Sequence, residues 1–224
     1  MLRQVLLRVL TFVVLGLLGQ QLSAQGVIGP SAVCKPVSMR TQQVGCWIMA
    51  DDPIGQLDKS SVFWTLDVYP TRAEAEADKG PRGTVLESLG KVWLSNIEYQ
   101  KSKPRHGSRA AEIGPLPVTS GQNYSVQYME VIFNPGMTAP EHNHSGPEAW
   151  YTLSGETCLE TSDGRVQVGR AGGSAVIVPM GLSMHLTATG KEQRRAIALI
   201  LHLTSQPPTS LDHNWAAKGL CNKQ

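Results

Sequence analysis

The stretch GMTAPEHNHSGPEAWYTLSG, residues 136–155, places His142 and His144 one residue apart and Glu148 four residues after the second histidine. Successive side chains of an extended strand point to opposite faces, so both imidazoles should project from the same face. A Ser-Gly-Pro turn signal at residues 145–147 separates them from the strand-like run that Glu148 begins. If the two runs pair as antiparallel strands, the carboxylate returns to the side of the imidazoles.

Two imidazoles and one carboxylate on a single face are the facial ligand set that holds a divalent metal ion and leaves coordination positions open. The pattern does not choose among iron, manganese, zinc, nickel and copper. Substrate or dioxygen can bind at the open positions, and Glu148 can detach and accept a proton, which makes it the candidate catalytic residue. The alternative is that His142 and His144 are surface residues of a loop and Glu148 is unrelated to them.

The spacing of the glycines, histidines and glutamate in this stretch matches the first signature of the cupin superfamily, and GSAVIVPMG at residues 173–181 matches the second. Over residues 124–203 the chain resembles exported bacterial cupin-domain proteins without an assigned reaction. The resemblance implies a double-stranded β-helix, the antiparallel jelly-roll barrel, with a metal held in its interior. It also implies a homodimer, because cupins commonly pair through their sheets. It supplies no substrate.

The resemblance also implies a fourth ligand, a histidine three residues after Gly181, but the chain has Met184 there and His185 one residue later. Because strand side chains alternate, His185 would face away from the metal unless a β-bulge absorbs the extra residue. Three alternatives remain open: His185 completes the metal ligands, Met184 lines the substrate pocket as an apolar or weak thioether neighbour, or no metal binds. Counting alternately from Glu148 turns Trp150 toward the interior, as a wall of the substrate pocket or as core.

The rest of the chain consists largely of short β-branched, aromatic and aliphatic runs separated by turn residues, which is typical of an all-β sandwich or barrel. One helix is expected in TRAEAEADKG, residues 71–80. Residues 44–97 read as strands but contain no histidine, so they form either a second, degenerate metal-free barrel or a β extension. His202, in the aliphatic run RRAIALILHL, is expected to be a hydrogen-bonded core histidine or a partner of a metal ligand.

The predicted organisation is a signal peptide at residues 1–24, an N-terminal β-rich region at 25–120, the cupin barrel at 121–205 and an irregular tail at 206–224. The first segment has basic residues before an apolar run that is shorter than the ~20 residues needed to cross a bilayer, and it ends in small residues. We therefore expect an exported protein, periplasmic or secreted, with no stable membrane span after cleavage.

All four cysteines follow the predicted cleavage site, in a compartment that permits disulfides: Cys34, Cys46, Cys158 and Cys221. Four thiols allow three complete pairings. Cys34 and Cys221 lie near the two mature ends, where a disulfide would restrain the termini, whereas Cys158 lies in a strand-like run and is expected to be a buried thiol. The small net charge of +2 argues against nucleic acid as a partner.

These observations favour a metal-dependent enzyme, dioxygenase-like or isomerase-like, that acts on a small molecule held in the pocket. Two other classes remain open. One is a non-catalytic periplasmic module that binds a small ligand or a metal in the same pocket. The other is a storage or structural barrel that serves as an assembly unit.

Overall fold

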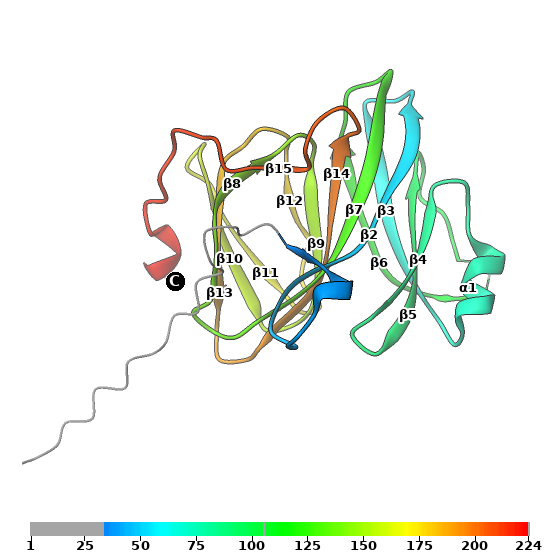
Figure 1. The fold of residues 1–224 in the computed structure, drawn as a ribbon, viewed down its shortest axis with the longest axis horizontal. Helices are drawn as coiled ribbons and strands as arrows, with labels where there is room; N and C mark the ends of the chain where they lie inside the picture. Colours follow the sequence, from blue (N-terminus) through cyan, green and yellow to red (C-terminus); the bar gives the residue numbers. More distant parts are fainter. Residues whose placement is uncertain (1–33, 105, 224) are drawn as a thin grey trace, which may run out of the picture.

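The computed structural model describes residues 34–104 and 106–223, so the expected signal peptide lies outside the described residues. Three layers of β-sheet lie side by side, with one short helix at an outer edge (Figure 1). The central sheet has six strands, in the order β1 (Lys35–Pro36), β2 (Gly45–Leu57), β7 (Gln122–Phe133), β14 (Arg194–Leu203), β9 (Glu148–Ser154) and β12 (Val176–Val178).

Two further sheets flank the central one. The five-stranded sheet has the order β11 (Val166–Arg170), β10 (Glu156–Thr161), β13 (Met184–Thr189), β8 (Thr138–His144) and β15 (Thr209–Ser210). The four-stranded sheet has the order β4 (Gly83–Ser88), β5 (Lys91–Glu98), β3 (Ser61–Tyr69) and β6 (Ser108–Pro117). The short 3-10 helices are η1 (Val37–Met39) and η2 (Leu220–Lys223).

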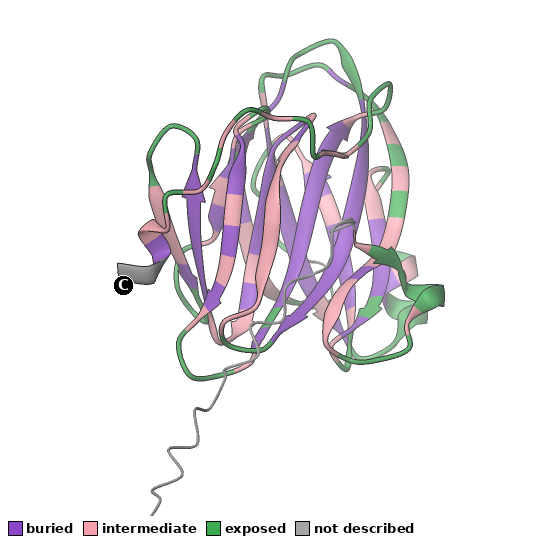
Figure 2. Cartoon of the chain, turned by 60° about the vertical axis from the view of Figure 1, so that its left-hand side comes forward, coloured by how far each residue is buried: buried purple, intermediate pink, exposed green. Residues whose placement is uncertain are grey.

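The central sheet is buried on both faces, since its middle strands, β7 and β14, are buried at nearly every position (Figure 2). In β7, Met129 and Val131 point toward the five-stranded sheet, whereas Val126 and Tyr128 point toward the four-stranded sheet. Because successive side chains of a strand point to opposite faces, β7 contributes to the hydrophobic cores on both sides of the central sheet. The central and five-stranded sheets are the two halves of the expected jelly roll, and the candidate metal ligands lie between them.

The strands of the first half form no second barrel. Strand β2 pairs with β7 along almost its whole length and so belongs to the central sheet. Strands β3 to β6 form an open sheet that packs its apolar side chains, among them Trp64 and Trp93, on the outer face of β7 and β14. Of the two alternatives, this is the β extension, and it covers a sheet face that would otherwise expose apolar side chains to water.

Helix α1 (Arg72–Asp78) occupies the expected segment. The Thr71 hydroxyl caps its start by accepting a hydrogen bond from the Glu74 backbone N–H at 3.3 Å.

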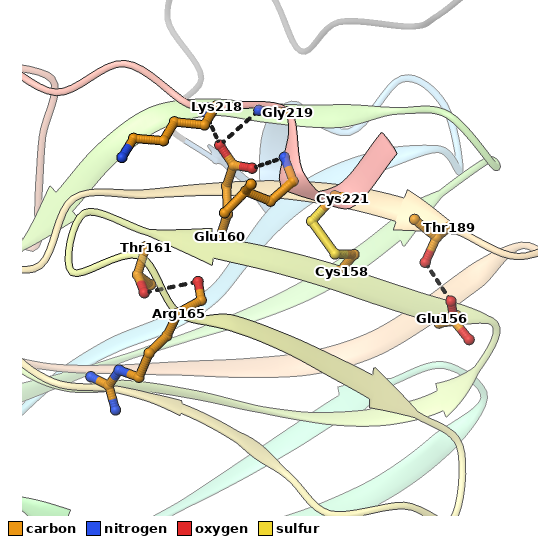
Figure 3. The surroundings of a disulfide bond; sticks show 10 residues. Glu156, Cys158, Glu160, Thr161, Arg165, Thr189, Lys218, Gly219 and Cys221 are labelled. Atoms are coloured by element: carbon orange, nitrogen blue, oxygen red, sulfur yellow. Dashed lines mark hydrogen bonds between the residues drawn. A yellow bond between two sulfur atoms is a disulfide. The ribbon is translucent and has the colours of Figure 1, made fainter. Parts of the chain in front are cut away.

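Two disulfides join Cys34 to Cys46 and Cys158 to Cys221, so the expectation of a free thiol at Cys158 was wrong. Cys158 faces outward on β10, and it is buried because the C-terminal tail covers it (Figure 3). Glu160, on the same outer face, accepts hydrogen bonds from the backbone N–H groups of residues 218, 219 and 220. The sequence around Cys158 predicts that its side chain is buried, but it does not show that a distant segment of the chain buries it.

Disulfides are consistent with an extracellular location, where oxidising conditions keep them intact. Among residues 34–104 and 106–223, no helix has the length and apolarity that crossing a bilayer requires.

Candidate metal centre

A cavity with about 60 Å³ of free space lies between the central and five-stranded sheets. Apolar side chains of β7, β8, β13 and β14, together with the Cys34–Cys46 disulfide, form most of its wall. Its polar lining comes from Gln127, His142, His144, Glu148, Arg194 and Thr209. By the space that one enclosed water needs, the cavity has room for roughly four to six water-sized groups.

His142 and His144 stand on the same face of β8, as the one-residue spacing predicts. Their ring centroids are 4.7 Å apart. One ligand atom each from His142, His144 and Glu148 lies within 4.8 Å of the others, and all three residues line the cavity. The sequence-predicted group is therefore brought together in the interior of the jelly roll, and the alternative of unrelated surface residues is wrong.

Glu148 reaches this group by a different route from the expected one. Strand β9, which it begins, does not pair with β8 but belongs to the opposite sheet, next to β14. The turn at residues 145–147 crosses between the sheets and passes so close to β14 that a Cβ at Gly146 would stand 1.7 Å from the Leu201 carbonyl oxygen. Glycine at this position therefore permits the crossing that aims Glu148 back at the imidazoles.

The hydrogen bonds of the two imidazoles leave one nitrogen of each free for a metal. Nδ1 of His142 is 2.7 Å from the Pro140 carbonyl oxygen, and Nδ1 of His144 is 2.8 Å from that of Pro208. A carbonyl oxygen only accepts, so Nδ1 carries a proton in each ring, and in the neutral imidazole Nε2 keeps a lone pair. Carbonyl partners of this kind are usual behind metal-ligating histidines.

The Nε2 atoms of the two imidazoles and the Glu148 carboxylate lie together at the cavity. Nε2 of His144 is buried and makes no hydrogen bond, although it lies 3.3 Å from Oε2 of Glu148. In a neutral ring, Nε2 and the carboxylate oxygen both offer lone pairs, and a metal ion between them would bind both. Burial lowers the pKa of His142 to about 4, which keeps this imidazole neutral and able to bind a metal at physiological pH. The residues thus fit a divalent metal ion.

His185 is not among the residues brought together. Met184 pairs with His142 across β13 and β8 and lines the cavity, whereas His185 pairs with Glu160 on the outer face of the same sheet. A register shift does separate Met184 from Leu186, but the extra residue belongs to β8, so it leaves the alternation of β13 unchanged. Met184 therefore lines the pocket, and His185, the proposed fourth ligand, points to the opposite face of the sheet.

Two further predicted residues take structural positions. Trp150 points into the interior but packs among apolar side chains such as Leu159 and Val176, outside the cavity wall, so the core alternative holds. His202 is buried, its Nε2 lies 3.3 Å from Oδ1 of Asp51, and it is not among the described residues that line the cavity.

Sequence reasoning missed two contributors to the site. The first is Arg194, a buried guanidinium in the cavity wall. Arg194, Ala198 and Ile200 are separated by even numbers of residues along one strand, so their side chains point to the same face. This spacing would have placed Arg194 inside once Ala198 or Ile200 was known to face the cavity. The second is the tail, which supplies the Pro208 carbonyl and the Thr209 side chain beside His144.

The Cupin domain family model matches residues 129–200, which include both signatures. A comparison with curated proteins found no match. Solved structures with a similar arrangement include a cupin superfamily protein from Desulfitobacterium hafniense, 17% identical, covering 39% of this chain and 73% of that one, with a TM-score of 0.32. A cupin-like protein from Thermotoga maritima is 17% identical over 45% of this chain and 86% of that one, with a TM-score of 0.34.

An oxalate oxidase in complex with the substrate analogue glycolate is 23% identical, with a TM-score of 0.32; the match covers 40% of this chain and less than half, 46%, of that one. The family match over both signatures and the jelly roll that encloses them show that residues 129–200 of this chain form a cupin domain.

Proposed function

We propose that this protein is a metal-dependent enzyme that acts on a small molecule in the cavity of the jelly roll. The observation that supports it is the group of three ligand atoms, from the half-buried His142 and the buried His144 and Glu148, within 4.8 Å of one another. Three protein ligands from one side of a metal ion leave coordination positions open on the other, where a substrate binds.

The metal, when bound, would polarise substrate oxygens, and a redox-active one such as iron would also activate dioxygen. The chain supplies the rest. Carbonyl partners hold both imidazoles in one tautomer, and apolar walls exclude water. Glu148, at the cavity wall, is placed to accept a proton from a substrate carbon or hydroxyl. Dioxygenase-like and isomerase-like reactions both use these parts.

A second candidate function is a non-catalytic module that binds a metal or a small ligand. It is favoured by the sparse chemistry of the wall: among the described lining residues, Glu148 is the sole carboxylate, and a methionine stands at the position of the family's fourth ligand. A site with one proton acceptor can hold a ligand without transforming it.

Metal titration tests the first half of the proposal. We expect Co²⁺ or Mn²⁺ to bind the metal-free protein in a one-to-one ratio, measured by calorimetry and, for Co²⁺, by visible absorption. His142→Asn and His144→Asn should each weaken binding strongly, whereas the matched variant His185→Asn should bind like the wild type because that side chain faces outward. Equal binding by all three variants would exclude this metal site.

Turnover tests the second half. Metal-loaded protein is incubated with a panel of small oxygenated compounds, and oxygen consumption and product NMR spectra are recorded. Glu148→Gln should abolish turnover, whereas Glu192→Gln, an exposed change outside the cavity, should preserve it. Full turnover by the Glu148 variant would refute its role. Metal binding without turnover of any compound would favour the binding module.

We further propose that the protein acts after export, in the periplasm or outside the cell. The two disulfides support this location, since cytosolic thiols are usually kept reduced. Fractionation of producing cells tests it: recovery of the oxidised protein from the cytosol alone would contradict it.

A further inference from the structure

Arg194, the first residue of β14, is a buried cation, and none of the described carboxylates is bonded to it. It is 1% exposed, and its Nε donates a hydrogen bond to the Thr157 hydroxyl. The guanidinium carbon lies 5.7 Å from the ring centroid of Phe133 and 5.8 Å from that of Trp150. A hydroxyl and two aromatic faces therefore hold this cation in place.

One of its donors is left over. Nη1 of Arg194 is buried and has no hydrogen-bond partner among the described residues. No described carboxylate forms an ion pair with the guanidinium, and Glu148 acts on it only through space. Burial lowers the pKa of Arg194 to about 10, so the group remains charged at neutral pH. An unpaired buried cation is costly, so it requires a compensating anion.

The cavity is where such an anion would fit. Arg194 lines the same cavity as His142, His144 and Glu148, with apolar side chains such as Val131 and Ile200 along the wall. When a divalent metal ion is held there by two neutral imidazoles, the metal and the guanidinium together outweigh the single negative charge of Glu148. The loaded cavity is then electropositive and favours an anion over a neutral ligand.

We propose that this cavity takes a small organic acid, whose carboxylate binds Arg194. The guanidinium matches a carboxylate in shape and charge, and its free Nη1 supplies a donor that the fold leaves unused. The cavity size limits the acid to a few heavy atoms. That the acid is also the substrate rests on the proposed function, whereas its binding to Arg194 does not.

The competing explanation is that Arg194 merely offsets the charge of Glu148 across the cavity. Acetate and acetamide separate the two explanations because they have nearly the same shape and differ in charge. Calorimetry or ligand-observed NMR on the metal-free and the Mn²⁺-loaded protein should show acetate binding and acetamide binding at least about tenfold more weakly. Equal binding of acetate and acetamide overturns the proposal.

Arg194→Met should weaken acetate binding to the metal-free protein roughly 10- to 100-fold, the range expected for losing a charged, fork-shaped donor. Arg195→Gln is the matched control, since Arg195 is the next residue of β14 but is exposed. It should leave acetate binding unchanged. Methionine replaces an unpaired buried charge by an apolar chain of similar length, so the variant should fold, and Arg194→Lys, which keeps the charge, should retain part of the affinity.

Failure of this inference is distinct from failure of the proposed function. If Arg194→Met binds acetate as tightly as the wild type, the inference is wrong, whatever the metal does. If acetate binding depends on Arg194 but Mn²⁺ does not bind, the anion site stands and the proposed metal-dependent activity falls. Mn²⁺ affinity of Arg194→Met should not fall below that of the wild type, because the substitution removes a positive charge from the cavity, and measuring it separates the two sites directly.

Discussion

Replacing Cys158 and Cys221 together by alanine should loosen the metal centre as well as destabilise the fold. The disulfide joins residues 63 apart in sequence. The chain entropy of closing a loop of that length corresponds to about 4 kcal/mol of stability. The Cys34–Cys46 disulfide, 12 residues apart, corresponds to about 3 kcal/mol in the same treatment. The two double-alanine variants should therefore lose similar stability, which makes the second a matched control for the first.

The two disulfides differ in what they hold. Cys221 anchors the tail whose Pro208 carbonyl lies 2.8 Å from Nδ1 of His144, with the Thr209 hydroxyl 3.2 Å from the same nitrogen. Losing the partner behind a metal-ligating histidine commonly lowers metal affinity by about 10- to 100-fold. The Cys158/Cys221 variant keeps the Glu160 hydrogen bonds and the short strand β15, so we expect the lower end, about tenfold.

Urea unfolding and Co²⁺ titration of both variants measure the two effects separately. The tail variant should show the larger loss of Co²⁺ affinity. The Cys34–Cys46 disulfide lines the cavity wall but supplies neither of the carbonyl partners of the imidazoles, so the Cys34/Cys46 variant should lose less. Circular dichroism before titration establishes that each variant is folded. Unchanged Co²⁺ affinity in the tail variant, or an equal loss in both, would refute the idea that the tail positions His144.

Two further predictions concern stability. Gly146→Ala places a Cβ 1.7 Å from the Leu201 carbonyl oxygen and should lower the free energy of unfolding by about 3 kcal/mol or more, seen as a Tm lower by roughly 10 °C. The control Gly80→Ala, whose new Cβ would have its nearest contact at 3.4 Å, should change Tm little. A normal Tm for Gly146→Ala would contradict the close approach of the turn to β14. The second follows from the pKa of His142, lowered by burial to about 4 from about 6.5 when unfolded. Between these pH values the unfolded chain binds a proton that the folded, metal-free protein does not, so the free energy of unfolding should rise with pH by up to about 3 kcal/mol. Urea titrations across this pH range should show a smaller rise for His142→Asn. The same rise in the wild type and the variant would refute the assignment to His142.

The features that the sequence predicted correctly depend on the two-residue period of a strand. That period alone puts His142 and His144 on one face. It also turns Met184 to the cavity, although the possibility of a bulge kept His185 among the candidate ligands. The residue types of the helix start and its cap at Thr71 are equally local. None of these requires knowledge of which strands pair.

The features that it could not predict depend on contacts between distant segments. Strand β9 joins β14, some fifty residues later, instead of its sequence neighbour β8, and the histidines and Glu148 still meet because both sheets turn these faces to one interior. The same holds for Cys158, which is covered by a tail segment 63 residues away. A strand-like run predicts that a residue is buried without showing what buries it.

The burial of Arg194 could not be predicted from the sequence, and this exception to the usual exposure of arginine is informative. Strand β14 is apolar on both faces because it lies between two other sheets, so its sequence carries no alternation that would assign either arginine of the Arg-Arg pair to the inside. The structure makes that assignment, with Arg194 buried and Arg195 exposed. Folding gains nothing from a buried guanidinium with an unused donor, since an apolar side chain of the same size would pack there at lower cost. Arg194 does not help the fold, and it lies in the wall of the cavity that holds the three metal-ligand atoms. A ligand that brings a negative charge to this guanidinium best accounts for its presence there.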